Sequence, residues 1–157
     1  MLEIQQLSKT YSNGVQALND VSLSIPKGMF GLLGPNGAGK SSLMRTLATL
    51  QPADSGTITF DGIDVLNQPM ALRRRLGYLP QSFSVYPRMP ADELLEHLAI
   101  LKGLHNKGER QDIVNELLAQ TNLYQHRKKA VSGFSGGMRQ RFGIAQALLG
   151  APRILII

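Results

Sequence analysis

The chain has 157 residues and no cysteine, a length typical of one domain, so disulfides and thiolate metal sites are excluded. No apolar run approaches the roughly 20 residues needed to cross a bilayer, and the first residues lack the pattern of a secretory signal. The 17 Lys and Arg outnumber the 11 Asp and Glu, and basic clusters occur at residues 73–75 and 127–129. Such clusters can bind nucleic acid or a membrane surface, but we favour solvated helix ends and expect no nucleic-acid partner.

The first third of the chain predicts strands on either side of a glycine-rich loop. Residues 2–7 and 21–25 alternate between apolar and polar residues, as antiparallel strands do, and residues 12–14 form a turn signal between them. Residues 29–33 are an apolar run short enough for a buried strand. We therefore expect an antiparallel region followed by a buried strand that enters the loop.

The loop at residues 34–41 reads Gly-Pro-Asn-Gly-Ala-Gly-Lys-Ser and fits the phosphate-binding pattern G-x-x-x-x-G-K-[ST]. Apolar residues at helical spacing follow it, so the motif lies between a strand and a helix, whereas a chance glycine turn would not need that context. Backbone N–H groups and the helix N-terminus would surround phosphate oxygens, Lys40 would reach the β- and γ-phosphates, and the Ser41 hydroxyl would ligate Mg²⁺. The residues that we expect to bind nucleotide here are Gly34, Asn36, Gly37, Ala38, Gly39, Lys40, Ser41 and Ser42.

Further along the chain the period changes from strand to helix. Residues 56–60 and 76–79 predict short strands, and residues 90–135 predict a helical insertion with amphipathic helices after residue 90 and around residues 113–121. Another helix is expected from about residue 136. The chain stops in an apolar run at residues 154–157, which we interpret as a strand cut from a longer parallel sheet and paired inside its core.

A second motif, at residues 134–141, reads Phe-Ser-Gly-Gly-Met-Arg-Gln-Arg where a loop enters a helix. Ser135 followed by two glycines is by itself most often an ordinary helix cap. Together with the phosphate loop and the helical insertion between them, however, the motif resembles the Leu-Ser-Gly-Gly-Gln signature of the ATP-binding cassette (ABC) family. The resemblance covers essentially the whole chain, with Phe134 in place of Leu and Met138 in place of Gln.

The resemblance implies an α/β fold: a P-loop NTPase core with an N-terminal antiparallel β-subdomain and an inserted helical subdomain, truncated at the C-terminus. The implied boundaries are residues 1–89 for the β-subdomain and core, 90–135 for the helical subdomain, and 136–157 for the signature helix and the start of the Walker B strand.

The resemblance also assigns roles to single residues. Tyr11 would stack on adenine, although an ordinary strand-end tyrosine is the alternative. Gln81 would position Mg²⁺ and water at the γ-phosphate, as the one catalytic and metal-site residue beyond the phosphate loop. Residues of the signature would contact the nucleotide of a partner subunit, and Met138 lacks the amide of the family's glutamine. These signature residues are Ser135, Gly136, Gly137 and Met138.

The implied function is ATP binding and, in the complete protein, Mg²⁺-dependent ATP hydrolysis that drives transport. The partners would be a second ATPase subunit, identical or different, and an integral membrane permease on another chain, with this chain on the cytoplasmic face of the membrane. The family's Walker B Asp, catalytic Glu and switch His are not in these residues, so we expect no hydrolysis by the isolated chain. A soluble ABC ATPase without a transport role and a nucleotide-binding module without catalysis are the alternatives, and the Ser-Gly-Gly-Met variant favours an exporter.

Overall fold

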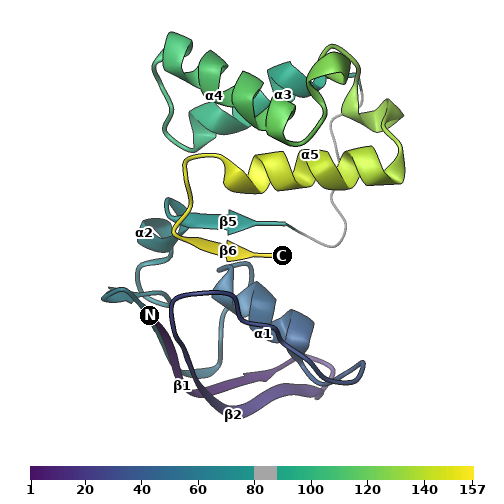
Figure 1. Cartoon of the computed structure of the whole chain (residues 1–157). Coiled ribbons are helices and arrows are strands. Elements are labelled where there is room, and N and C mark those ends of the chain that lie inside the picture. Colours follow the sequence, from purple (N-terminus) through teal and green to yellow (C-terminus); the bar gives the residue numbers. More distant parts are fainter. Residues whose placement is uncertain (80–87) are drawn as a thin grey trace. The chain divides into compact units, whose positions relative to one another are not determined.

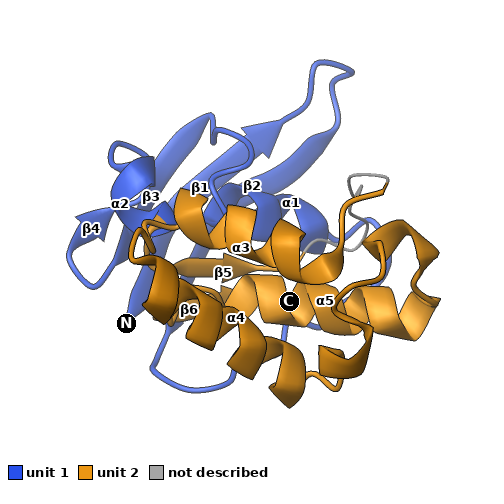
Figure 2. Ribbon diagram, turned by 90° about the horizontal axis from the view of Figure 1, so that it is seen from above, with its two compact units in different colours: residues 1–73 blue, residues 74–157 orange. Residues whose placement is uncertain are grey.

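The computed structural model describes residues 1–79 and 88–157, so the predicted site residue Gln81 lies outside the described residues. These residues form two compact units, residues 1–73 (unit 1) and residues 74–157 (unit 2), coloured separately in Figure 2. The domain boundaries expected at residues 89 and 135 stay predictions. The elements in chain order are β1 (Leu2–Thr10), β2 (Gln16–Ile25), α1 (Lys40–Leu47), β3 (Ser55–Phe60), β4 (Ile63–Asp64), α2 (Pro69–Arg73), β5 (Leu76–Tyr78), α3 (Ala91–Leu101), α4 (Lys107–Gln120), the 3₁₀ turns Tyr124–His126 and Val131–Gly133, α5 (Gly136–Leu148) and β6 (Ile154–Ile156).

Unit 1 contains an antiparallel sheet with the strand order β2-β1-β3-β4 (Figure 2). Its alternating pattern places apolar side chains opposite one another, with Ile4 facing Ile58 in the β1–β3 ladder, and both are buried. The predicted turn closes the β1–β2 hairpin, where the Tyr11 N–H donates to the Val15 carbonyl over 2.9 Å. The antiparallel N-terminal strands are confirmed.

The strand predicted at residues 29–33 is wrong. This segment has no regular secondary structure, and Leu33 is 94% exposed. A strand exists only when its backbone groups pair with a neighbour, and among the described residues the backbone of residues 29–33 has no such partner. An apolar run indicates a preference for burial but does not supply the neighbouring strand.

Unit 2 is built on α5. In Figure 1 this helix lies between the parallel β5–β6 pair and the helices α3 and α4. The three helices share one apolar core, as their predicted amphipathic patterns require. Its fully or almost fully buried members include Leu94, Leu95, Val114, Leu118, Phe142 and Leu149. Within the two described ranges, every helix is too short or too polar to traverse a bilayer.

The strand expected at residues 154–157 forms as β6, whereas its place inside the core of a longer parallel sheet stays a prediction. Ile154 lies opposite Leu76 in a parallel ladder with β5, and β5 is the partner of β6 in the described part of the chain. Leu155 is 41% exposed. A central strand needs a neighbour on each side, and among the described residues β6 pairs with β5 alone.

Candidate nucleotide-binding site

The phosphate loop passes directly against strand β2 of the same unit. Gly39 is the N-cap of α1 and has φ = +84°, a left-handed conformation that favours glycine. A Cβ atom at this position would lie 2.3 Å from the carbonyl oxygen of Ala17. The last glycine of the motif is therefore required both by its backbone angle and by the space available.

The first turn of α1 presents backbone donors at the end of this loop. Among the described residues, the N–H groups of Gly39, Lys40 and Ser41 have no hydrogen-bond acceptor. The first turn of the helix contains no acidic residue that would compete with an anion. Free donors and the positive end of the helix dipole together make this end of α1 a suitable site for phosphate oxygens.

Lys40 adds the mobile cation of the site. Its Nζ donates to the carbonyl oxygens of Gly34 and Pro35, over 2.6 and 2.7 Å. The side chain thus curls back over the loop, with its ammonium group at the carbonyl oxygens of the first two loop residues. A phosphate oxygen brought to the loop would meet a cation that is already in position.

The two serines that follow Lys40 have different surroundings. Ser41 is exposed, so its hydroxyl is accessible as one oxygen ligand to Mg²⁺. The other predicted metal contact, Gln81, lies outside the described residues. Ser42 is buried, and its Oγ lies 2.9 Å from the Tyr11 hydroxyl. The predicted nucleotide contact of Ser42 remains a prediction, and its hydroxyl already has a protein partner.

Tyr11 lies just after β1, and its hydroxyl makes the contacts that the sequence did not indicate. Besides Ser42, it contacts Gln51, to whose Oε1 it donates over 3.1 Å. The hydrogen bond with Ser42 lowers the pKa of the tyrosine below its usual value. Stacking on adenine would use the ring face, so it remains a prediction beside this role of the hydroxyl. Gln51 belongs to no motif, and no sequence signal identifies it.

The signature motif opens α5 in unit 2. Ser135 is the N-cap, and its Oγ accepts a hydrogen bond from the Met138 N–H over 3.3 Å, while Gly136 and Gly137 are exposed. The Met138 side chain packs against the helical core. The cap interpretation is therefore confirmed, and the exposed glycines leave a second helix N-terminus open to an anion.

Phe134 explains how the motif tolerates its first departure from the family pattern. The side chain is 3% exposed, and its ring meets the Phe142 ring edge to face, with centroids 6.4 Å apart. This position anchors the loop before α5 in the helical core. An apolar residue is needed there, and phenylalanine satisfies that need as leucine would.

Comparison with known proteins agrees with this geometry. A model of the ABC transporter family matches residues 18–157. The chain is 40% identical over its whole length to the ABC transporter ATP-binding protein YxlF of Bacillus subtilis, of which it covers 51%, and 36% identical over its whole length to the phosphonates import ATP-binding protein PhnC of Chromohalobacter salexigens, of which it covers 62%. The chain thus spans between half and two thirds of the length of these relatives.

A solved structure extends the similarity to three dimensions. The dimeric, post-hydrolysis state of the ATP-binding cassette MJ0796 bound to ADP and Pi superposes with a TM-score of 0.88 at 30% identity, over 99% of this chain and 72% of that chain. The predicted α/β fold class of a P-loop NTPase is confirmed. The family model matches almost nine tenths of the chain, and the chain has the fold of a solved ATP-binding cassette. The chain therefore belongs to the ABC transporter family and forms part of its ATP-binding domain.

Proposed function

We propose that the full-length protein binds ATP with Mg²⁺ at the phosphate loop and hydrolyses it to drive transport through a separately encoded membrane permease. The observation that carries the proposal is the loop itself. Gly39 brings the backbone against β2, the first N–H groups of α1 are free of protein acceptors among the described residues, and the Lys40 ammonium lies over the same loop. These are the donors that a triphosphate requires.

The proposed working unit contains two such domains. A phosphate bound at one loop retains unneutralised charge, and the exposed glycines at the start of α5 can supply further donors from a second subunit. The similar cassette MJ0796 is described as a dimer bound to ADP and Pi, which supports the same arrangement here. Closure on ATP and opening after hydrolysis would then form a two-state switch.

The permease and the membrane location follow from the proposed transport role. The domain would lie on the cytoplasmic face, where ATP is available, and a permease on another chain would bind the transported substrate. The exporter direction stays a prediction, and PhnC, an import protein by its name, matches the whole chain as well. The catalytic and metal-ordering carboxylates would follow β6 in the full-length protein.

Lys40→Ala in the full-length protein tests the nucleotide site. Hydrogen bonds to a charged group contribute about 1.5–3 kcal/mol, so we expect ATP affinity to fall roughly 10- to 150-fold in isothermal titration calorimetry. Lys27→Ala is the matched control, because Lys27 is an exposed lysine of the same unit outside the loop. Equal ATP affinity in the Lys40 variant and the parent protein would refute the assignment of the phosphate loop.

The Mg²⁺ dependence and the transport role of the proposed function need separate measurements. Ser41→Ala should spare metal-free ATP binding and weaken its Mg²⁺ dependence, and an unchanged Mg²⁺ titration would leave Ser41 as a plain helix residue. The transport role predicts that the full-length protein sediments with membranes together with an integral membrane protein. A soluble ATPase would stay in the supernatant.

A further inference from the structure

A hydrogen-bonded link joins the end of the β-sheet to the first turn of the phosphate-loop helix. The Tyr11 hydroxyl, just beyond β1, lies 2.9 Å from Ser42 Oγ in α1 and 3.1 Å from Gln51 Oε1 after α1. Tyr11 lies 31 residues before Ser42 and 40 before Gln51 in the sequence, and all three belong to one compact unit. One hydroxyl group therefore connects three segments of the site's framework.

Gln51 fixes the direction of the hydrogen bonds. Its Nε2 donates to the Ser42 carbonyl and to Thr46 Oγ1, each over 3.0 Å, and Thr46 Oγ1 donates its own proton to the Ser42 carbonyl over 2.9 Å. The amide nitrogen must face these two acceptors, so Oε1 faces Tyr11 and accepts its proton. The Tyr11 oxygen is then the acceptor for the Ser42 hydroxyl. Each polar group of this network has a partner, which makes the arrangement specific.

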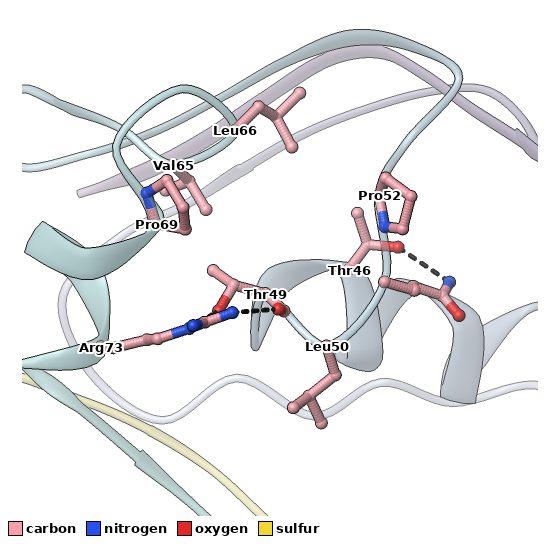
Figure 3. A pocket seen from close by; sticks show the side chains of 9 residues that line it. Thr46, Thr49, Leu50, Pro52, Val65, Leu66, Pro69 and Arg73 are labelled. Carbon is pink, nitrogen blue, oxygen red and sulfur yellow. Dashed lines mark hydrogen bonds between the residues drawn. The ribbon is translucent and has the colours of Figure 1, made fainter. Parts of the chain in front are cut away.

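Gln51 is only partly buried and borders open space. Thr46 and Gln51 line a cavity of about 240 Å³ beside α1, together with Leu66 and Arg73 (Figure 3). Figure 3 shows the Thr46 hydroxyl in its hydrogen bond at the wall of this cavity. Side chains next to open space have room to rotate, so hydrogen bonds fix the amide and, through it, the Tyr11 hydroxyl.

We propose that the Tyr11 hydroxyl is a positioning group for the phosphate-loop helix, acting through Ser42 and Gln51. Ser42 directly follows Lys40 and Ser41, so a shift of its backbone moves the ammonium and the hydroxyl expected to meet phosphate and Mg²⁺. This role concerns the phosphate end of the nucleotide, whereas stacking by the ring would concern the base. The inference rests on the proposed nucleotide function of the loop.

The test separates the hydroxyl from the ring by using a ligand that has no base. We expect Tyr11→Phe in the full-length protein to weaken binding of both Mg²⁺-ATP and Mg²⁺-tripolyphosphate by a similar factor, roughly 2- to 12-fold, the range for one neutral hydrogen bond. Calorimetry also reports stoichiometry. A merely structural defect would lower the bound fraction, whereas a positioning role raises the dissociation constant at unchanged stoichiometry.

Three further single variants and one double variant make the test specific. Tyr124→Phe is the matched control, because the Tyr124 hydroxyl makes no hydrogen bond to another described residue. Phenylalanine also keeps the ring, whose centroid lies 4.0 Å from the guanidinium carbon of Arg127. Ser42→Ala should weaken tripolyphosphate binding and Ser42→Thr, which keeps a hydroxyl, should restore it. Combining Ser42→Ala with Tyr11→Phe should cost less than the product of the two single losses.

These measurements distinguish failure of the positioning role from failure of the proposed nucleotide site. If the parent protein binds neither ligand, the nucleotide site and this inference both fail. If the parent binds both ligands and Tyr11→Phe binds tripolyphosphate as tightly as the parent, the positioning role alone is overturned. A loss for ATP only, seen in Tyr11→Ala and absent in Tyr11→Phe, would assign Tyr11 to base stacking and would overturn the inference as well.

Discussion

Gly39→Ala probes the closest backbone approach in the phosphate loop. The substitution places a Cβ atom 2.3 Å from the carbonyl oxygen of Ala17, and it forces alanine into a backbone conformation with φ = +84°. Ala17 lies in β2 at an irregularity of the ladder, between Gln16 and Leu18, which both pair with β1, so a shift of its carbonyl would strain these two pairs. We therefore expect a large loss of stability from a single methyl group.

The expected loss of stability in Gly39→Ala has a conformational part and a steric part, and a comparison with Gly37→Ala separates them. Gly37 has nearly the same angle, φ = +86°, but no atom lies within 4 Å of a Cβ built there. The left-handed conformation costs both variants roughly 1–2 kcal/mol, and the lower entropy of the unfolded chain returns about 0.4–1 kcal/mol to both. Overpacking against Ala17 costs Gly39→Ala a further 1–3 kcal/mol or so. The difference between the two variants should therefore be about 1–3 kcal/mol.

Urea unfolding of the full-length protein measures this difference. The chain contains no tryptophan, so far-UV circular dichroism is a suitable signal for this domain. The free energy of unfolding should fall in the order parent, Gly37→Ala, Gly39→Ala. Equal stability of the two variants would show that the contact with Ala17 relaxes at no cost, and the steric part of the reasoning would be refuted.

Two other predictions concern a surface ion pair and the signature loop. The hydrogen bond from Lys9, together with the Thr10 N–H, lowers the pKa of Asp54 below 3.8, so the pair stabilises the fold at neutral pH and this contribution is lost as the pH falls below 3.8. Asp54→Asn should lower the melting temperature at neutral pH, and the two proteins should converge in acid; a constant difference across the titration would contradict the assignment. Phe134→Ala should cost about 3–5 kcal/mol in the free energy of unfolding, and Phe134→Leu less than about 1.5 kcal/mol; similar losses in both variants would mean that ring contact with Phe142 matters more than apolar volume.

Local features of this protein were determined by the sequence itself. A helix forms its hydrogen bonds within one segment, so the apolar period and the cap residues suffice to locate it. Ser135 caps α5 as its position before two glycines indicates, and α1 follows the glycine loop as the motif requires. The order of the two motifs, with helices between them, was also sufficient to identify the family.

Features that depend on distant partners were decided only by the tertiary structure. Residues 29–33 and β6 are both apolar runs, yet only β6 pairs with another strand among the described residues, because a strand needs backbone partners from elsewhere in the chain. The contact between Tyr11 and Gln51 also depends on the tertiary structure, since nothing in the sequence indicates that these two residues are neighbours. A periodic pattern indicates which side of an element is buried. Which residues cover that side is determined only by the tertiary structure.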